Sequence, residues 1–286
     1  MTRGAGAPRT AKKREHLQAT AREHPEYREI LSLFLEIYAR IEGSEGATGI
    51  AFSLPERYGE ERVRGGLPLL SPESLSVDRD RAVPFLMGVL DALRRAGRQG
   101  EEEIAKIERS LTEGALDLRP LFAACMSRER GPLVETAGTI SVPPPLLEFV
   151  LEVPLKTALE EAAESVDPKA LEGWKEAFCP VCGSRPAMDE LVGEEGKRAL
   201  SCSSCSFLWP YPRIKCAYCG NEDPETLSYF TAGDGPTRVG VCRKCSRYIK
   251  TRDSRKGNAE VPLDAEDLTT LHLDLLAGKE GFERGR

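Results

Sequence analysis

Four Cys-x-x-Cys pairs lie within residues 179–245 and contain eight of the nine cysteines of this 286-residue chain. The two thiolates of such a pair can reach one cation at about 2.3 Å, and two pairs complete a tetrahedral four-sulfur shell for zinc or iron. Four pairs therefore predict two metal ions, iron or zinc. The predicted metal ligands are Cys179, Cys182, Cys202, Cys205, Cys216, Cys219, Cys242 and Cys245.

An internal repeat indicates how the four pairs combine. The sequence Cys-Pro-Val-Cys-Gly at Cys179 recurs as Cys-Ala-Tyr-Cys-Gly at Cys216, and the stretches around Cys202 and Cys242 also match. Two copies of one ribbon predict sequential pairing, the first pair with the second and the third with the fourth. A crossed arrangement stays open, because sequence alone does not fix connectivity. Gly183 and Gly220 follow the first pair of each copy, where the turn needs a positive φ.

The metals have two competing interpretations. Each copy has too few apolar residues to fold unaided, and a structural zinc contributes about 10 to 16 kcal/mol of coupled binding and folding energy, which favours a structural role. A redox or sulfur-handling centre is the alternative. A fully cysteine-coordinated ion has no open position for a substrate, so Lewis-acid catalysis is the least favoured role. The regular spacing and the lack of a secretory segment disfavour disulfides.

Composition and charge narrow the class of protein. With 40% hydrophobic residues, the chain is long enough for one well-cored domain and a smaller appendage. A formal net charge of −6 argues against nucleic-acid binding by the whole surface. Residues 1–22 are basic and polar without the apolar core of a signal peptide, and no apolar run is long enough to span a membrane. These features predict a cytoplasmic protein.

The predicted fold class is α+β, with an α-helical domain over residues 1–172 and a double four-cysteine metal-binding domain over 173–286. Apolar periodicity and helix-boundary signals predict helices from Thr10, over about 25–42, 81–96, 101–112 and 117–127, and from Leu146, with Pro154 kinking or splitting the last. The segment between the second and third of these helices reads as a long connection, in which residues 66–70 lie extended against the helices.

Short β-prone segments separate the cysteine pairs. Residues 198–201 and 226–230 predict the small antiparallel hairpins of zinc ribbons and rubredoxin-like folds. Three aromatic residues between the copies are interpreted as a small core that clamps the copies together, in preference to a base-stacking platform: Trp209, Tyr211 and Tyr218. Residues 264–276 predict an amphipathic C-terminal helix.

Several other residues could carry chemistry. Cys125 lies among small and apolar neighbours, which predicts a buried inert thiol, and His272 is expected to be an ordinary helix-face residue and not a ligand. A cationic run surrounds the last cysteine pair. It either offsets the negative four-thiolate site or docks an acidic partner surface. Its members are Arg238, Arg243, Lys244, Arg247, Lys250, Arg252, Arg255 and Lys256.

Five stretches of the sequence match one known family: residues 179–186, 200–205 leading to Trp209, 213–220, 242–250 and 266–276. Through these stretches, the region of about 179–282 resembles the FdhE-type formate dehydrogenase accessory proteins. The N-terminal half matches only loosely, through residues 68–70 and the Pro-rich entry to the helix at 146.

The resemblance implies a cytoplasmic maturation factor that binds the catalytic subunit of a molybdenum- or tungsten-dependent formate dehydrogenase and assists its assembly or activation. It also implies rubredoxin-type iron, held by the eight cysteines. We therefore expect a partner-binding protein that is not itself an enzyme, with a homo-oligomer left open. The alternative is a zinc-ribbon nucleic-acid-binding protein, suggested by the ribbons beside the cationic run and disfavoured by the acidic charge. A redox enzyme that uses a cysteine pair as a dithiol is a weaker third option.

Overall fold

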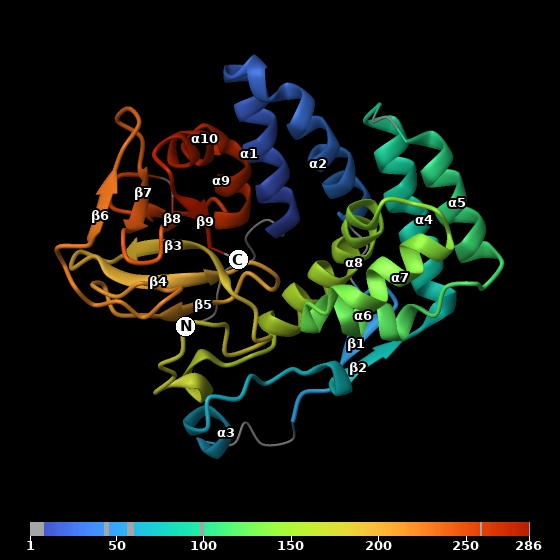
Figure 1. The fold of residues 1–286 in the computed structure, drawn as a ribbon, viewed down its shortest axis with the longest axis horizontal. Helices are drawn as coiled ribbons and strands as arrows, with labels where there is room; N and C mark the ends of the chain where they lie inside the picture. Colours follow the sequence, from blue (N-terminus) through green and yellow to red (C-terminus); the bar gives the residue numbers. More distant parts are fainter. Residues whose placement is uncertain (1–8, 43–45, 56–59, 98–99, 258, 286) are drawn as a thin grey trace.

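A computed structural model of the chain describes residues 9–42, 46–55, 60–97, 100–257 and 259–285. Its helical part precedes residue 165, and a single seven-stranded sheet lies beside that part, with two short C-terminal helices between the sheet and the first helix (Figure 1). The mixed architecture, helical first and sheet-containing second, confirms the predicted α+β class. The expected domain boundary near residue 173 stays a prediction.

The first two helices form a hairpin. Helix α1 covers Arg9–Glu23, a 3-10 turn follows at Pro25–Tyr27, and α2 covers Arg28–Ile41. Proline therefore begins the 3-10 turn, and the regular helix starts three residues later than the sequence predicted. The apolar face of α2 is packed as expected, with Leu31, Ile37 and Tyr38 buried.

Three of the remaining N-terminal helices agree closely with the predicted ranges: α4 (Arg79–Arg95), α5 (Glu101–Thr112) and α6 (Leu118–Ser127). Helices α4 and α6 pack against α8, which covers Pro144–Glu164, and α5 packs against α4. Helix α7 (Arg130–Thr139) was not predicted, because it buries only Leu133 and Ala137 and so lacks an apolar period. Helix α8 continues through Pro154, so the expectation of a split is wrong, and that of a kink stays a prediction. Packing against α4, α6 and α7 offsets the backbone bond that proline removes.

The segment between α2 and α4 is more ordered than predicted. Strands β1 (Ile50–Phe52) and β2 (Leu75–Val77) pair antiparallel, and a short helix α3 (Glu60–Arg64) lies between them. The backbone N–H groups of Leu69 and Leu70 donate to the carbonyl oxygens of Pro180 (2.9 Å) and Val181 (2.7 Å). This extended stretch is therefore held by the first cysteine pair, a contact that the sequence did not predict.

The two sequence copies share one sheet. The first copy supplies β3 (Pro186–Val192), β4 (Lys197–Cys202) and β5 (Leu208–Pro210), and the second supplies β6 (Leu227–Phe230), β7 (Thr237–Cys242) and β8 (Arg247–Asp253). The strand order is β5-β4-β3-β8-β7-β6, and the short strand β9 (Glu283–Arg284) also pairs with β8. The copies join where β3 and β8 run parallel, with Glu190 opposite Arg252. The predicted hairpins are therefore present, but they belong to one continuous sheet and not to two separate modules.

The C-terminal helix is divided in two. Helix α9 (Leu263–Thr269) contacts α1 and β3, and α10 (Leu271–Lys279) contacts β7 and β9. The break falls at Thr270, whose hydroxyl donates to the carbonyl oxygen of Glu266 at 2.8 Å, a local bond that competes with regular helix. Within the described residues, no helix is long and apolar enough to cross a membrane.

Two hydrophobic clusters form the interior. The large cluster joins the N-terminal helices to the first copy and includes Leu159, Val181, Trp209 and Ala265. The small cluster lies between the second copy and α10, and it consists of Val239, Val241, Tyr248, Leu273 and Ala277. The first copy is thus part of the main core, whereas the second copy adds Ala217 and Ile249 to that core and supplies three residues of the small cluster.

Candidate metal centres

The eight predicted cysteines gather into two groups of four. Within each group, the sulfur atoms all lie within 4.8 Å of one another. Site 1 consists of Cys179, Cys182, Cys202 and Cys205, and site 2 consists of Cys216, Cys219, Cys242 and Cys245. The sequential pairing is confirmed, and the crossed alternative is wrong.

The sulfur separations fit a tetrahedral cation. In site 1, the Sγ atoms of Cys179 and Cys205 are 3.5 Å apart, and those of Cys182 and Cys202 are 3.4 Å apart. In site 2, the corresponding separations are 3.8 Å and 3.7 Å. A metal–sulfur bond of about 2.3 Å gives a tetrahedron with edges of about 3.8 Å. All nine cysteines are free thiols, so the disulfide interpretation is not supported.

The first pair of each site closes the same turn. Gly183 and Gly220 have φ angles of +74° and +70°, the positive values that the sequence predicted. The N–H of each glycine donates to the carbonyl oxygen of the first cysteine, at 2.9 Å for Cys179 and 3.0 Å for Cys216. The N–H of each first cysteine donates to the carbonyl oxygen of the residue after the glycine, which is Ser184 or Asn221, at 2.8 Å in both copies.

The second pair of each site also ends in a left-handed residue, which sequence reasoning missed. Ser206 and Ser246 follow Cys205 and Cys245, with φ angles of 55° and 53°. A positive φ is uncommon outside glycine and marks a tight backbone position. The signal that could have found it is the repeated Cys-x-x-Cys-Ser sequence.

N–H groups point at the sulfur atoms in both sites. The backbone N–H groups of Ser204 and Cys205 donate to Cys202 Sγ at 3.3 and 3.4 Å, and that of Tyr218 donates to Cys216 Sγ at 3.4 Å. The side-chain amide of Asn221 donates to Cys242 Sγ at 3.6 Å. Such bonds favour the thiolate form that binds a metal. Asn221 was not singled out from the sequence.

Burial makes a bound cation the natural partner of these sulfurs. Burial raises the pKa of the Cys179 and Cys205 thiols well above the usual value. Four adjacent thiolates in such an environment would repel one another, and a divalent or trivalent cation removes that repulsion. The residues therefore fit a four-sulfur metal centre, and a closed shell leaves no coordination position for a substrate.

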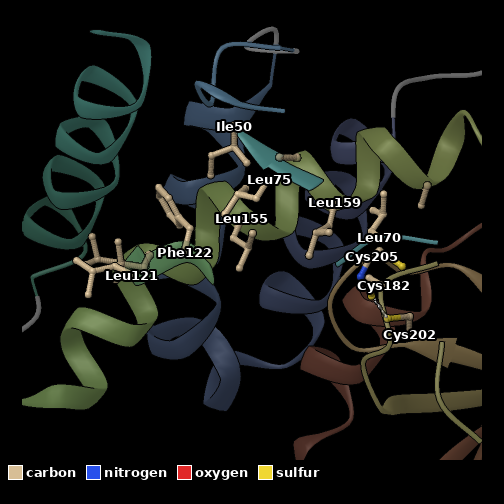
Figure 2. Packing of buried hydrophobic residues seen from close by; sticks show 14 of the residues in the cluster. Ile50, Leu70, Leu75, Leu121, Phe122, Leu155, Leu159, Cys182, Cys202 and Cys205 are labelled. Atoms are coloured by element: carbon tan, nitrogen blue, oxygen red, sulfur yellow. Dashed lines mark hydrogen bonds between the residues drawn. The ribbon is translucent and has the colours of Figure 1, made fainter. Parts of the chain in front are cut away.

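The two sites differ in exposure. All four cysteines of site 1 are buried, whereas in site 2 Cys219 is exposed and Cys245 is half-buried. Figure 2 shows Cys182, Cys202 and Cys205 near Leu70 and Leu159, at the edge of the main core. Site 1 is thus enclosed by the helical part, and site 2 is open to the surroundings.

A polar network connects site 1 to the helices. Lys156 of α8 donates to the carbonyl oxygen of Ser203 (3.3 Å) and to Ser206 Oγ (3.2 Å), and Ser206 Oγ donates to Glu160 (2.7 Å). Glu160 also accepts from Lys13 of α1 at 2.9 Å. Burial alone would raise the pKa of Glu160, but Lys156 and Lys13 outweigh it and lower the pKa to about 2. No sequence pattern indicated these long-range contacts.

Part of the cationic run has a structural role. Lys250 is buried and pairs with Asp267 (2.8 Å) and Asp274 (2.7 Å), and Arg252 is buried and pairs with Glu190 (2.6 Å). These two cations neutralise carboxylates, not thiolates. They are also unavailable to phosphates, which weakens the nucleic-acid alternative.

The other singled-out residues lie outside the metal groups. His272 Nδ1 lies 2.8 Å from the hydroxyl of Tyr27. Cys125 is half-buried, and burial raises the pKa of its thiol to about 12, which keeps it protonated and inert.

Of the aromatic residues between the copies, Trp209 and Tyr211 are buried and Tyr218 is half-buried. Trp209 donates to the carbonyl oxygen of Glu176 at 3.2 Å, and the hydroxyl of Tyr218 in the second copy donates to that of Pro186 in the first at 3.4 Å.

Comparison with known proteins matches this region to one family. The model of the FdhE central domain matches residues 178–213, and that of the FdhE C-terminal domain matches residues 214–286. A protein FdhE homolog from Aquifex aeolicus is 38% identical over 141 residues, which cover 48% of this chain and 49% of that protein. The aligned region thus spans about half the length of this relative.

Two further proteins are similar over most of the chain. A protein FdhE homolog from Rhizobium meliloti is 25% identical over 268 residues, which cover 88% of this chain and 87% of that protein. The crystal structure of the FdhE protein from Pseudomonas aeruginosa matches with a TM-score of 0.65 and 23% identity, over 96% of this chain and 93% of that one. This last likeness supports the fold, including its helical N-terminal part.

Proposed function

The resemblance to the FdhE family is confirmed over residues 178–286, and from it we propose that this chain is an accessory protein of a formate dehydrogenase. It binds the catalytic subunit of that enzyme in the cytoplasm and assists its assembly or activation. The observation that carries the proposal is that all eight clustered cysteines fall inside the matched region.

Each four-cysteine site holds one metal ion, iron or zinc, in this proposal. Cys179, Cys182, Cys202 and Cys205 are the ligands of the first ion, and Cys216, Cys219, Cys242 and Cys245 are the ligands of the second. A bound ion would cross-link the two cysteine pairs of its site, and iron would add a one-electron couple. The thiolates hold the ion, and the N–H groups that point at Cys202, Cys216 and Cys242 stabilise their charge.

The chain acts by binding and not by catalysis. Both sulfur shells are closed, so neither presents an open metal position to a substrate. The helical part and the sheet are joined through site 1, and this arrangement supports a rigid surface for a partner protein.

Affinity isolation tests the proposal. The tagged chain is purified without oxygen from cells that make a formate dehydrogenase, and the co-purifying proteins are identified by mass spectrometry. We expect the catalytic subunit to be enriched relative to a tag-only control. A doubly substituted Cys179→Ser, Cys182→Ser chain serves as the matched control and should lose the enrichment along with one metal ion. Absence of the subunit from the wild-type isolate would contradict the proposal.

A further inference from the structure

A pocket of about 340 Å³ lies at the seam between the two sequence copies. It occupies the sheet face opposite α9 and α10: Lys250 points to those helices, whereas its neighbours Ile249 and Thr251 line the pocket. The pocket extends across β3, β8, β7 and β6, which places it beside Cys216 and Cys242 of site 2. Four adjacent strands are separated by three spacings of about 4.8 Å each, so the pocket is long enough for roughly four residues of an extended chain.

Cations dominate the polar lining of this pocket. Its cationic residues are Arg198, Arg213, Lys215, Arg238 and Arg247, and Asp189 is the single carboxylate among the described lining residues. Arg198, Lys215 and Arg247 each have a carboxylate partner. Arg213 and Arg238 have none among the residues that the structure describes. The Arg238 guanidinium lies 4.1 Å from the ring centroid of Tyr229, whose exposure is 62%. Two unneutralised guanidinium groups favour carboxylate ligands.

Asp189, unlike the arginines, requires a hydrogen-bond donor from a ligand. It is 1% exposed, and its Oδ2 accepts from Arg198 at 2.6 Å. Its Oδ1 is buried and has no hydrogen-bond donor in the described part of the chain. A buried carboxylate oxygen favours an N–H donor. A ligand that satisfies the whole lining therefore carries both carboxylates and N–H groups, as a peptide does and an inorganic anion does not.

Gly240 leaves the floor of the pocket open. A Cβ atom at this position would lie 3.5 Å from Thr251 Oγ1 and 3.6 Å from the carbonyl oxygen of Ile249, which are ordinary contacts. The fold itself thus does not require glycine here, although glycine weakens a strand interior. Such a glycine is typical of a site where a ligand or another backbone approaches closely.

We propose that this pocket binds an acidic, extended segment of a partner protein. Carboxylates of the segment pair with Arg213 and Arg238, a backbone N–H reaches Asp189, and the segment passes over Gly240. The chemistry of the segment follows from the pocket alone, whereas the identity of the partner as a formate dehydrogenase subunit rests on the proposed function.

Peptide binding tests the pocket directly. The metal-loaded full chain is titrated into a fluorescently labelled eight-residue peptide with four glutamates among leucines and serines, and anisotropy is measured. We expect saturable binding that weakens by about 10-fold in Arg238→Gln, the loss of one charge-assisted pair, and by at least as much in Gly240→Val. Two matched controls should bind as the wild type does: Lys197→Gln, which changes an exposed charge at the start of β4, and Gly278→Ala in α10.

Three results would overturn the inference. The first is no binding by the wild type, and the second is equal binding of a peptide that has lysines in place of the glutamates. The third is undiminished binding by both pocket variants when their metal content is intact. Full displacement of the peptide by inorganic phosphate at constant ionic strength would identify only a small-anion site.

Capture of the catalytic subunit separates the two proposals. If the wild type captures the subunit and Gly240→Val captures it equally well, the pocket inference fails and the proposed function stands. If the wild type captures none, the proposed function fails and the pocket is judged by the peptide alone.

Discussion

At the scale of single residues, the two sites depend on backbone positions as much as on sulfur. Gly183 and Gly220 both sit at positive φ, yet their surroundings differ. A Cβ at Gly183 would lie 3.0 Å from Cγ of Pro68, whereas one at Gly220 would meet nothing within 4 Å. Gly183 therefore serves both the turn and the close approach of residues 67–70 to the first cysteine pair.

Alanine substitution at these glycines should separate the two contributions. Gly220→Ala should lower the free energy of unfolding by about 1 to 2 kcal/mol, the cost of a left-handed non-glycine residue. Gly183→Ala should lower it further, because Pro68 must also shift. Chemical denaturation of the metal-loaded variants measures both values. Equal losses would contradict a packing role for Pro68 at site 1.

At the scale of elements, site 1 belongs to the main core and site 2 does not. All four cysteines of site 1 belong to the large hydrophobic cluster, whereas no cysteine of site 2 belongs to either cluster of the described residues. Exposed Cys219 gives chelators and oxidants a route into site 2.

A chelator should therefore remove the metal ion of site 2 before that of site 1. We expect one ion per chain to leave rapidly, from site 2, and the second only slowly or on unfolding. Cys219→Ser should lose the fast ion and keep the thermal transition of the helices, whereas Cys182→Ser should lower that transition. Metal release followed by absorbance of a chelating dye, with circular dichroism at 222 nm in parallel, measures both effects. Release of both ions at one rate would contradict the difference between the sites.

Elements with strong local patterns were predictable from sequence, and those made by distant contacts were not. The apolar stripe of α2 and the extent of α5 follow from the spacing of apolar residues, and the eight cysteines follow from their repeat. Helix α7 buries too few residues to carry a period, and the parallel pairing of β3 with β8 joins segments about 60 residues apart, which no local pattern encodes. Asn221 and Ser206 are polar residues whose roles depend on the folded turns: Asn221 donates to a cysteine sulfur, and Ser206 has a positive φ.

At the scale of the whole molecule, buried charges hold the two parts together. Lys13 of α1 and Lys156 of α8 meet Glu160 of α8 and Asp264 of α9, and Lys13 lies 2.6 Å from Asp264. This charge cluster lies directly behind Ser206, next to site 1. The metal site and the contact between the two parts are therefore one structural unit.

Removing one charge from this cluster should destabilise the whole chain. Glu160→Gln leaves buried Lys13 and half-buried Lys156, with Arg9 beside them, facing only Asp264, and we expect a loss of about 3 to 5 kcal/mol. Since the folded-state pKa of Glu160 is lowered to about 2 from a usual 4.5, its contribution is present above pH 4.5 and is lost as the pH falls towards 2. The variant should thus lose less stability than the wild type on acidification. Denaturation at pH 7 and pH 3 measures this, with Glu195→Gln at an exposed turn as the control.

The central claim is that two closed four-sulfur centres hold this protein in its folded form. Native mass spectrometry of protein purified without oxygen tests it most directly. The account predicts two metal ions per chain, and one ion in the doubly substituted Cys216→Ser, Cys219→Ser chain. A compact wild-type chain that carries no metal and is unaffected by chelators would contradict it.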